Sequence, residues 1–335
     1  MLGFYILLRA FGISAWLAGL GGVIWAFSSY FFILIPAGHI WKFVTLAYIP
    51  PTIAGVVLAY RKKYLLGGVI TALFIALQIQ SNHIQMSYYF MFVILFFIIA
   101  YFVDAYEKKE LPHFFKASAI LALAAVVGVC VNISNLYHTY EYSKETMRGK
   151  SELKQEGPAA NQTSSGLDRD YITNWSYGIG ETLTLLVPNV KGGGCSTTLS
   201  QNETAMAKAN PMYGNLYSQL TPYFGDQPWT AGPVYVGAFV VFLFILGCFI
   251  VKGPLKWALL GATIFSILLS WGKNFMGLTD FFIDYIPMYN KFRTVEMALV
   301  IPGMVFPIIA IWGLKEIVSG KVDDALFKRG LIVSL

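Results

Sequence analysis

The sequence predicts an all-α polytopic membrane protein with about eight transmembrane helices and one long external loop region. Of its 335 residues, 56% are hydrophobic and 13% are charged, whereas soluble domains carry roughly 25% charged residues. Eight apolar stretches are long enough to cross a bilayer, which takes roughly 20 apolar residues. A single long polar segment separates the first five stretches from the last three.

The predicted spans divide the chain into three parts. They cover residues 13–34, 42–60, 64–81, 86–104, 116–136, 231–251, 256–271 and 296–314. Residues 1–137 form a membrane bundle of five spans, preceded by an apolar helix stump at 1–8 that is too short to cross. Residues 138–230 form an extracytoplasmic loop domain. Residues 231–335 form a second bundle of three spans with a cytoplasmic tail.

The positions of lysine and arginine predict one orientation. Clusters such as Arg61-Lys62-Lys63 and Lys108-Lys109 lie on alternate connections, and the connections between them carry few cations. Because cations collect on the cytoplasmic side, the long loop is expected outside. The testable positions are Lys63, Glu110 and Gly253 inside, and Asn161 and Gly277 outside. The formal charge of +6 follows from this topology, and no basic face for nucleic acid is expected.

One stretch of the long loop places an acid between two flexible turns. Tyr177 and Gly178 precede Glu181, and Pro188-Asn189 follows a run of leucine and valine. The pattern leaves open whether the element between the turns is a strand or a short interfacial helix, since the alternation of its apolar residues is incomplete. A structured loop that lies on the membrane and a catalytic role for the acid both fit, because a single acid is ambiguous.

Polar side chains gather at the predicted outer ends of the spans. Such groups are costly in lipid and commonly face a bundle interior or a water-filled cavity. A lipid-linked phosphate needs cations at headgroup depth, and the candidates are His39, Lys42, His83, Lys291 and Arg293. A sugar acceptor needs a carboxylate to take its proton, and the candidate catalytic residues are Glu181 and Asp226.

A groove is expected beside these groups. Its predicted lining residues are Asn82, Gln85 and Tyr177, and the spacing of Gln78, Asn82 and Gln85 places them on one stripe of a helix. Structural roles are also open: His83 bonded to a backbone carbonyl, and Lys42 and Arg293 as headgroup anchors. The three cysteines have no metal-site spacing. No cofactor follows from the sequence, and a divalent cation is the one candidate.

Short motifs follow one another along nearly the whole chain. They are Phe27-Ser28-Ser29-Tyr30-Phe31, Ala37-Gly38-His39, Asn82-His83-Ile84-Gln85 with Tyr88-Tyr89, Ser176-Tyr177-Gly178 through Glu181-Thr182 to Pro188-Asn189 with Gly192-Gly193, Tyr223-Phe224-Gly225-Asp226-Gln227-Pro228, and Tyr289-Asn290-Lys291-Phe292-Arg293. In order and spacing they resemble the signatures of the bacterial YfhO membrane proteins. That family is similar to the GT-C superfamily of polytopic glycosyltransferases.

The resemblance implies transfer of a sugar from a polyprenyl-phosphate donor to a cell-envelope glycan acceptor, at the outer face of the bacterial cytoplasmic membrane. GT-C proteins place their catalytic acid in the first external loop, which would lie upstream of Met1. We therefore expect a central fragment without transfer activity of its own. Two other classes stay open. One is a lipid or solute transporter or flippase, with a path along the span broken by Pro50-Pro51. The other is a non-catalytic envelope scaffold.

Overall fold

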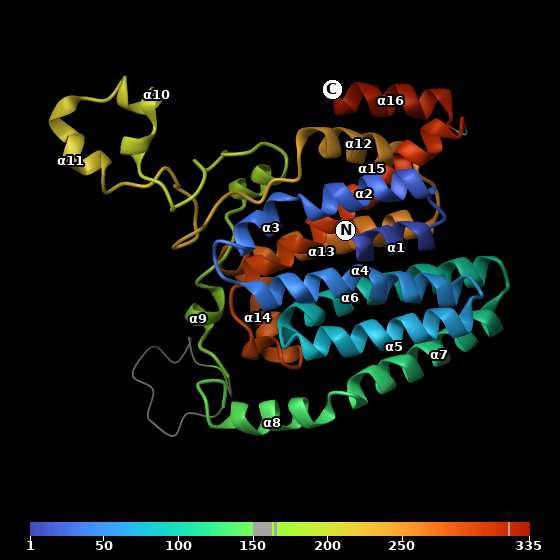
Figure 1. Ribbon diagram of the computed structural model, residues 1–335. Coiled ribbons are helices and arrows are strands. Elements are labelled where there is room, and N and C mark those ends of the chain that lie inside the picture. Colours follow the sequence, from blue (N-terminus) through green and yellow to red (C-terminus); the bar gives the residue numbers. More distant parts are fainter. Residues whose placement is uncertain (150–162, 164–165, 321) are drawn as a thin grey trace.

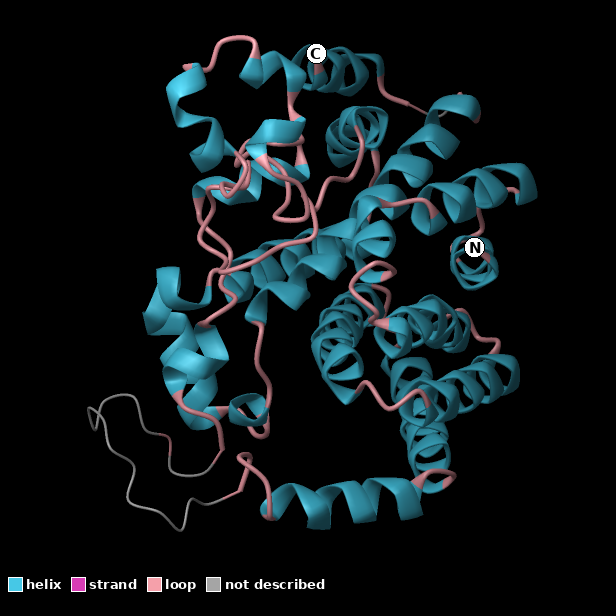
Figure 2. Cartoon of the chain, turned by 60° about the vertical axis from the view of Figure 1, so that its left-hand side comes forward, coloured by secondary structure: helices cyan, strands magenta, loops and turns pink. Residues whose placement is uncertain are grey.

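The computed structural model describes residues 1–149, 163, 166–320 and 322–335, and in these residues every regular element is a helix (Figures 1 and 2). The first bundle contains α1 (Leu2–Ala10), α2 (Ala15–Ala26), α3 (Ser29–Leu34), α4 (Ile40–Tyr60), α5 (Tyr64–Gln80), α6 (Ile84–Glu107) and α7 (Leu111–Cys130). The second contains α12 (Ala238–Ile250), α13 (Pro254–Ser270), α14 (Met276–Tyr285), α15 (Val300–Val318) and α16 (Asp324–Ser334).

Short helices lie between the two bundles. They are α8 (Ile133–Lys144), α9 (Arg169–Thr173), the 3-10 helix η2 (Gly180–Leu185), α10 (Glu203–Met206) and α11 (Gly214–Tyr217). The segment with α9 and η2 lies against one end of the long helices, and α10 and α11 form a lobe apart from them (Figure 1). The contested element around Glu181 is thus a 3-10 helix and not a strand.

Several helices are suited to a membrane. In the described residues, five are long and apolar enough to cross one: Ala15–Leu34, Ile40–Tyr60, Ile84–Glu107, Leu111–Cys130 and Val295–Val318. The pair Pro254–Ser270 and Gly272–Tyr285, bent by 108°, makes a sixth if it is one span. The two remaining predicted spans contain shorter apolar helices, α5 and α12, of 17 and 13 residues. An all-helical fold with five or six candidate spans is confirmed, and the number eight stays a prediction.

Breaks divide two of the predicted spans. The stretch 13–34 is two helices, because the Ser29 hydroxyl donates to the Tyr235 carbonyl and accepts from the Tyr235 amide, both at 2.8 Å. The predicted span 116–136 ends early, at Cys130, and the Asn132 side chain beyond the break donates to the Ala76 carbonyl of α5 at 2.9 Å. The apolar stump at 1–8 is α1, which packs against α2 and α4.

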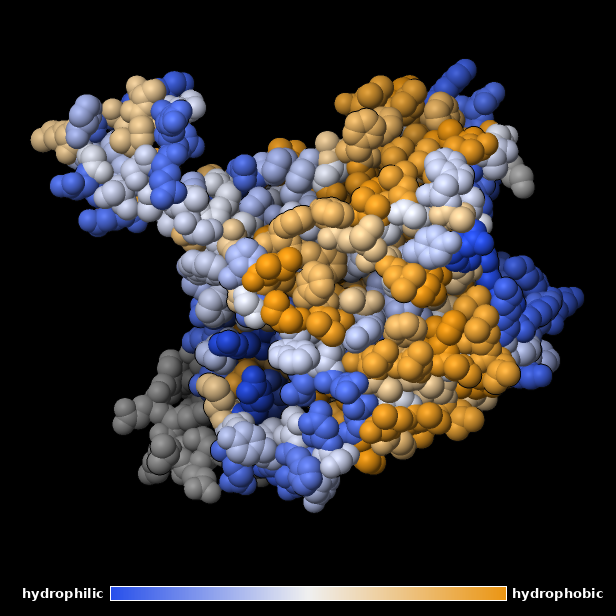
Figure 3. All heavy atoms as spheres, viewed as in Figure 1, coloured by the Kyte–Doolittle hydropathy of each residue, from blue (hydrophilic) through white to orange (hydrophobic). Residues whose placement is uncertain are grey.

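The helices α15 and α4 form the centre of the molecule. Their apolar windows are 89% and 72% buried, against 28% for α7 at the periphery. The outer helices present large apolar side chains, among them Leu65, Leu123 and Phe239. On the face in Figure 3, hydrophobic side chains cover the helices and hydrophilic ones lie toward the ends. This distribution is expected of a protein whose outer surface contacts lipid.

The two ends of the bundle differ in composition. At the loop-side end, α4 and α6 begin, α13 ends, and the loop segment with α9 and η2 covers them (Figure 1). At the basic end, α4 and α6 end at residues flanked by cations, and α13 begins. Lys63, Glu110 and Gly253 belong to the basic end and Gly277 to the loop-side end. Asn161 lies outside the described residues. Which end is cytoplasmic stays a prediction.

The closest helix contact joins α4 and α5 through small residues. A Cβ added to Gly67 would lie 2.5 Å from the Ala59 amide nitrogen and 2.6 Å from the Gly55 carbonyl oxygen. Both atoms are backbone, so neither can move without shifting a helix. Small residues let two helix backbones approach this closely, which gives van der Waals contact that lipid does not supply.

We therefore expect Gly67→Ala to lower the free energy of unfolding by about 1–3 kcal/mol, the usual cost of overpacking. Unfolding in detergent, followed by helical circular dichroism, measures this cost. The control is Gly19→Ala in α2, where an added Cβ meets nothing within 4 Å. Alanine favours helix over glycine by up to about 1 kcal/mol, so the control should be neutral or stabilising. Equal stability of the two variants would refute the close contact.

Candidate functional site

The loop-side end brings together segments that are far apart in sequence. The Gln85 amide donates to the Arg293 carbonyl oxygen at 2.6 Å. The Thr294 amide donates to the Ile172 carbonyl oxygen at 3.1 Å, so the loop fixes the same segment from its other side. Thr294 has φ of 64°, which is rare for a β-branched residue, and such strain is concentrated at functional sites. The chain is therefore constrained immediately before Glu296.

Lys42, on the first turn of α4, is the most unusual residue at this end. It is only 3% exposed, and its ammonium makes no hydrogen bond to any described residue. Its charge interacts with the carboxylate of Glu296, which also lacks a hydrogen bond from the described residues. Burying a charge is costly unless it is paired and hydrogen-bonded. These two groups thus have unused bonding capacity.

Other buried polar atoms nearby also lack partners. In the described chain the Tyr30 hydroxyl, the His83 Nδ1 and the Tyr289 hydroxyl are buried without a hydrogen bond. Tyr30 lies close enough to Glu296 and Tyr89 for their charged forms to affect its ionisation. Buried polar atoms in proteins are nearly always hydrogen-bonded, so unpaired ones in one place require an explanation. The group, which we call the polar cluster, consists of Tyr30, His39, Lys42, His83, Tyr89 and Glu296.

The two histidines of the polar cluster are poor proton acceptors. Burial, and then the positive charge of Lys42, lowers the pKa of His83 from 6.5 to about 4. Burial also lowers the pKa of His39, with smaller contributions from Lys42 and Arg293. Both effects disfavour the charged imidazole. His83 is therefore neutral near pH 7, and Lys42 supplies the positive charge.

Four of the five predicted phosphate-binding residues converge here, and the fifth has another contact. His39 lies within electrostatic range of Lys42, His83 and Arg293, and His83 lies within range of Lys42. Arg293 also donates to the Tyr171 hydroxyl at 2.5 Å. Lys291 donates to the Arg148 carbonyl oxygen at 2.6 Å, which ties it to the loop. The adjacency that the phosphate-binding prediction requires is present, while phosphate binding itself stays a prediction.

Glu181 has a fully occupied carboxylate. Oε1 accepts from the Tyr223 hydroxyl at 2.8 Å and the Gln227 amide at 3.2 Å. Oε2 accepts from the backbone amides of Gly178 at 3.2 Å and Asp226 at 3.4 Å. The residue is 3% exposed. Its burial and its hydrogen bonds suit a structural role, in which it holds the 223–227 turn against η2. Its catalytic role stays a prediction.

Asp226 lies at the surface of the 223–227 turn. Its Oδ2 accepts from the Asn274 side chain at 2.9 Å, and its backbone oxygen accepts from Lys273 Nζ at 3.1 Å. Asn274 also donates to the Tyr177 carbonyl at 2.9 Å. Asp226 is exposed, unlike Glu181. It remains a candidate for contact with an acceptor.

The predicted groove residues do not share a helix stripe. Helix α5 ends at Gln80 and α6 begins at Ile84, so Gln78 and Gln85 belong to different helices. Asn82 is exposed and has φ of 56°, because asparagine tolerates the left-handed conformation that terminates a helix. Gln85 and Tyr177 are buried, and the Tyr177 amide donates to the Ser270 carbonyl at 2.8 Å. The single-helix stripe expected for Gln78, Asn82 and Gln85 was wrong.

Sequence reasoning missed Glu296, Tyr30 and Tyr89 as site residues. Glu296 opens the long apolar run of Val295–Val318, and an acid in that position is a recognisable signal of function. The tyrosines gave no such signal, since aromatic residues are abundant in this chain. In the described part of the chain, no group of three or more His, Cys, Asp or Glu side chains is placed to hold a metal ion.

Comparisons with protein-family models, curated proteins and solved structures found no match to this chain. The likeness to the YfhO proteins therefore remains a prediction from short motifs. The functional argument depends on the geometry of the polar cluster and its surroundings.

The buried neutral state of His83 predicts a pH dependence of stability. Its folded pKa of about 4 lies below the ordinary histidine value of 6.5, so the unfolded chain binds more protons between these two values. Stability from this residue is complete above pH 6.5 and is lost as pH falls toward 4, by about 3 kcal/mol. Unfolding in detergent across this range should fall less steeply for His83→Gln than for the wild type. A matched change at exposed His138, His138→Gln, should leave the slope unchanged; identical slopes in all three proteins would contradict the burial.

Proposed function

We propose that this chain is a multi-pass protein of the bacterial cytoplasmic membrane that binds a polyprenyl-phosphate-linked sugar at its loop-side end, for transfer to a cell-envelope glycan. The supporting observation is the polar cluster, in which the ammonium of the buried residue Lys42, the Tyr30 hydroxyl and the His83 Nδ1 have no hydrogen-bond partner among the described residues. A phosphate accepts charge-assisted hydrogen bonds from such donors. One anion would therefore satisfy groups that the fold leaves unpaired.

An apolar cavity beside the polar cluster suits the lipid chain. It has a volume of about 320 Å³, and Phe31 and Phe43 line it together with Trp25 and Phe74. Phe43 follows Lys42 in the chain, and Phe31 follows Tyr30. The proposed path of the lipid chain therefore runs from a phosphate at Lys42 to this cavity, whose wall residues Phe31 and Phe43 are next to Tyr30 and Lys42 in the chain. The hydrophobic effect would contribute about 0.8 kcal/mol for each buried CH₂ group of the chain.

Glu296 is the carboxylate best placed to take part in transfer. In sugar transfer the acceptor hydroxyl oxygen attacks the anomeric carbon, the bond to phosphate breaks, and a base takes the hydroxyl proton. Glu296 has free lone pairs within the described chain, whereas those of Glu181 are occupied. Its charge also interacts with that of Glu181. If this chain catalyses the transfer itself, the proton-accepting role falls to Glu296 first and to Glu181 or Asp226 second.

The proposal predicts the effect of removing the buried ammonium. Lys42→Met keeps the length and apolar stem of the side chain, and it should weaken binding of undecaprenyl phosphate at least 10-fold, the effect of losing about 1.4 kcal/mol. Binding is measured on the full chain in nanodiscs. The control is Lys208→Met, an equal loss of charge at an exposed position on the lobe. Glu296→Gln should leave the affinity for undecaprenyl phosphate within a few-fold of the wild type, since the proposal gives this carboxylate a role in proton transfer and none in phosphate binding. Unchanged affinity of a folded Lys42→Met protein would refute the phosphate site.

Transport is the second candidate, and the broken helix pair favours it. Helix α13 and the following Gly272–Tyr285 segment meet at 108°, and broken helices line the binding sites of many transporters. The orphaned polar groups lie at the loop-side ends of the helices, however, and transport sites commonly lie near the bilayer midplane. Proteoliposomes that moved a labelled polyprenyl phosphate between leaflets, with loss of movement in Lys42→Met, would favour transport.

A further inference from the structure

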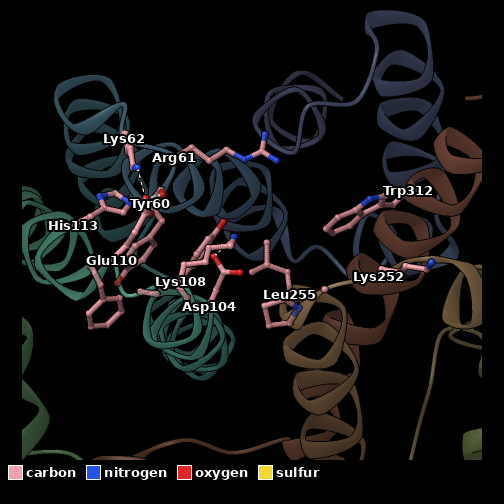
Figure 4. Close-up of a pocket in the computed structure, with 15 residues that line it drawn as sticks. Tyr60, Arg61, Lys62, Asp104, Lys108, Glu110, His113, Lys252, Leu255 and Trp312 are labelled. Carbon is pink, nitrogen blue, oxygen red and sulfur yellow. Dashed lines mark hydrogen bonds and ion pairs between the residues drawn. The ribbon is translucent and has the colours of Figure 1, made fainter. Parts of the chain in front are cut away.

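A second cavity lies at the basic end, at the opposite ends of α4 and α6 from the polar cluster. Its volume is about 410 Å³, and it lies between α4, α6 and α7 on one side and α13 and α15 on the other (Figure 4). We call it the basic pocket and define it by six lining residues: Tyr60, Arg61, Tyr101, Lys108, Lys252 and Trp312. Its volume is in the range of small-molecule sites.

The charges around the basic pocket leave a positive excess. Four cations and two carboxylates line it, and these are Arg61, Lys62, Lys108, Lys252, Asp104 and Glu110. Both carboxylates are already paired, Glu110 with Lys62 at 2.9 Å and Asp104 with Lys108 at 2.7 Å. The excess charge therefore belongs to Arg61 and Lys252. His113, also in the wall, has both ring nitrogens bonded, to the Tyr64 hydroxyl and the Tyr60 carbonyl.

Two donors of the pocket are unused. The Tyr101 hydroxyl is buried and has no hydrogen-bond partner among the described residues, although its ring stacks on Tyr60 with centroids 4.4 Å apart. Lys252 is exposed in the turn before α13 and makes no hydrogen bond within the described chain. Arg61 is partly used, since its guanidinium donates to the Ala10 carbonyl at 2.7 Å and the Phe11 carbonyl at 3.3 Å. Figure 4 shows Arg61 and Trp312 facing the open space.

We infer that the basic pocket binds a phosphate ester, with its anionic oxygens on Arg61, Lys252 and the Tyr101 hydroxyl. The Arg61 guanidinium has five N–H groups, so N–H groups other than the two that bond Ala10 and Phe11 can donate to a phosphate oxygen, and the Lys252 ammonium adds a point charge. The aromatic walls of Tyr60, Tyr101 and Trp312 suit an apolar or glycerol portion next to the phosphate. Basic pockets between membrane helices commonly hold anionic lipid headgroups. An anionic phospholipid is therefore the first source, and a soluble phosphate ester has the same chemistry.

Native mass spectrometry of the full chain tests the inference, with phosphatidylglycerol and phosphatidylcholine as probes. We expect the wild type to retain phosphatidylglycerol at least 10-fold more strongly than phosphatidylcholine. Lys252→Gln removes a cation that makes no hydrogen bond within the described chain, and Tyr101→Phe removes only an unpaired hydroxyl. Each should weaken retention about fivefold, the effect of losing roughly 1 kcal/mol. The matched control is Lys63→Gln, an exposed cation at the same end that does not line the pocket.

Competition with glycerol 1-phosphate distinguishes the two sources. If phosphatidylglycerol stays bound in excess glycerol 1-phosphate, the ligand is a membrane lipid. If glycerol 1-phosphate displaces it, and Tyr101→Phe weakens the binding of glycerol 1-phosphate as it weakens that of the lipid, the ligand is a soluble ester. Equal retention of both lipids by the wild type would overturn the inference. An equal fall in phosphatidylglycerol retention in Lys63→Gln and Lys252→Gln would also overturn it, because this would show that general surface charge attracts the lipid. Thermal unfolding of Tyr101→Phe in detergent confirms that the variant is folded.

Discussion

The burial of α4 and α15 determines how the loop-side end is built. These are the most buried of the candidate spans, so any polar group on their first turns is taken out of water with them. Lys42 lies on the first turn of α4, and Glu296 precedes α15 by one 3-10 turn, η7 (Val295–Leu299). Their mutual attraction offsets part of the desolvation, but neither gains a hydrogen bond from the described chain. The fold thus places the Lys42 ammonium near the Glu296 carboxylate without an ion pair or a hydrogen bond between them in the described chain, which is costly for stability and useful for binding.

The segments around Lys42 and Glu296 are held in place by side chains that make hydrogen bonds within the protein. Glu181 joins the 223–227 turn to η2 by accepting hydrogen bonds from Tyr223, Asp226 and Gln227, and Gln85 joins α6 to the segment before α15. A site held by saturated neighbours keeps its donors in place before a ligand arrives, which lowers the entropy cost of binding. Polar groups whose hydrogen bonds are all made within the protein are supporting residues, and buried polar groups without a hydrogen bond are the candidate binding residues. The basic pocket follows the same pattern, since its carboxylates are paired and the Tyr101 hydroxyl is not.

Sequence patterns predicted the helical membrane class and the approximate place of every long helix, because apolar length is a local property. They did not predict the break before Ser29, since it depends on Tyr235, which lies 206 residues away. The saturation of Glu181 likewise needs Tyr223 and Gln227, which the chain brings back only by folding. For His39, Lys42, His83 and Arg293 the sequence predicted only a common depth in the membrane. Depth says nothing about lateral position, so Glu296 and Tyr30 were not recognised as their neighbours.

The most direct test of phosphate binding at the polar cluster is an experimental structure of the full chain with bound undecaprenyl phosphate. We expect density for the phosphate next to Lys42, with an oxygen about 2.8 Å from Nζ, the usual length of a charge-assisted hydrogen bond. The lipid chain should enter the apolar cavity beside Phe31 and Phe43. Phosphate density elsewhere, with the Lys42 ammonium still without a hydrogen bond, would contradict the proposed site.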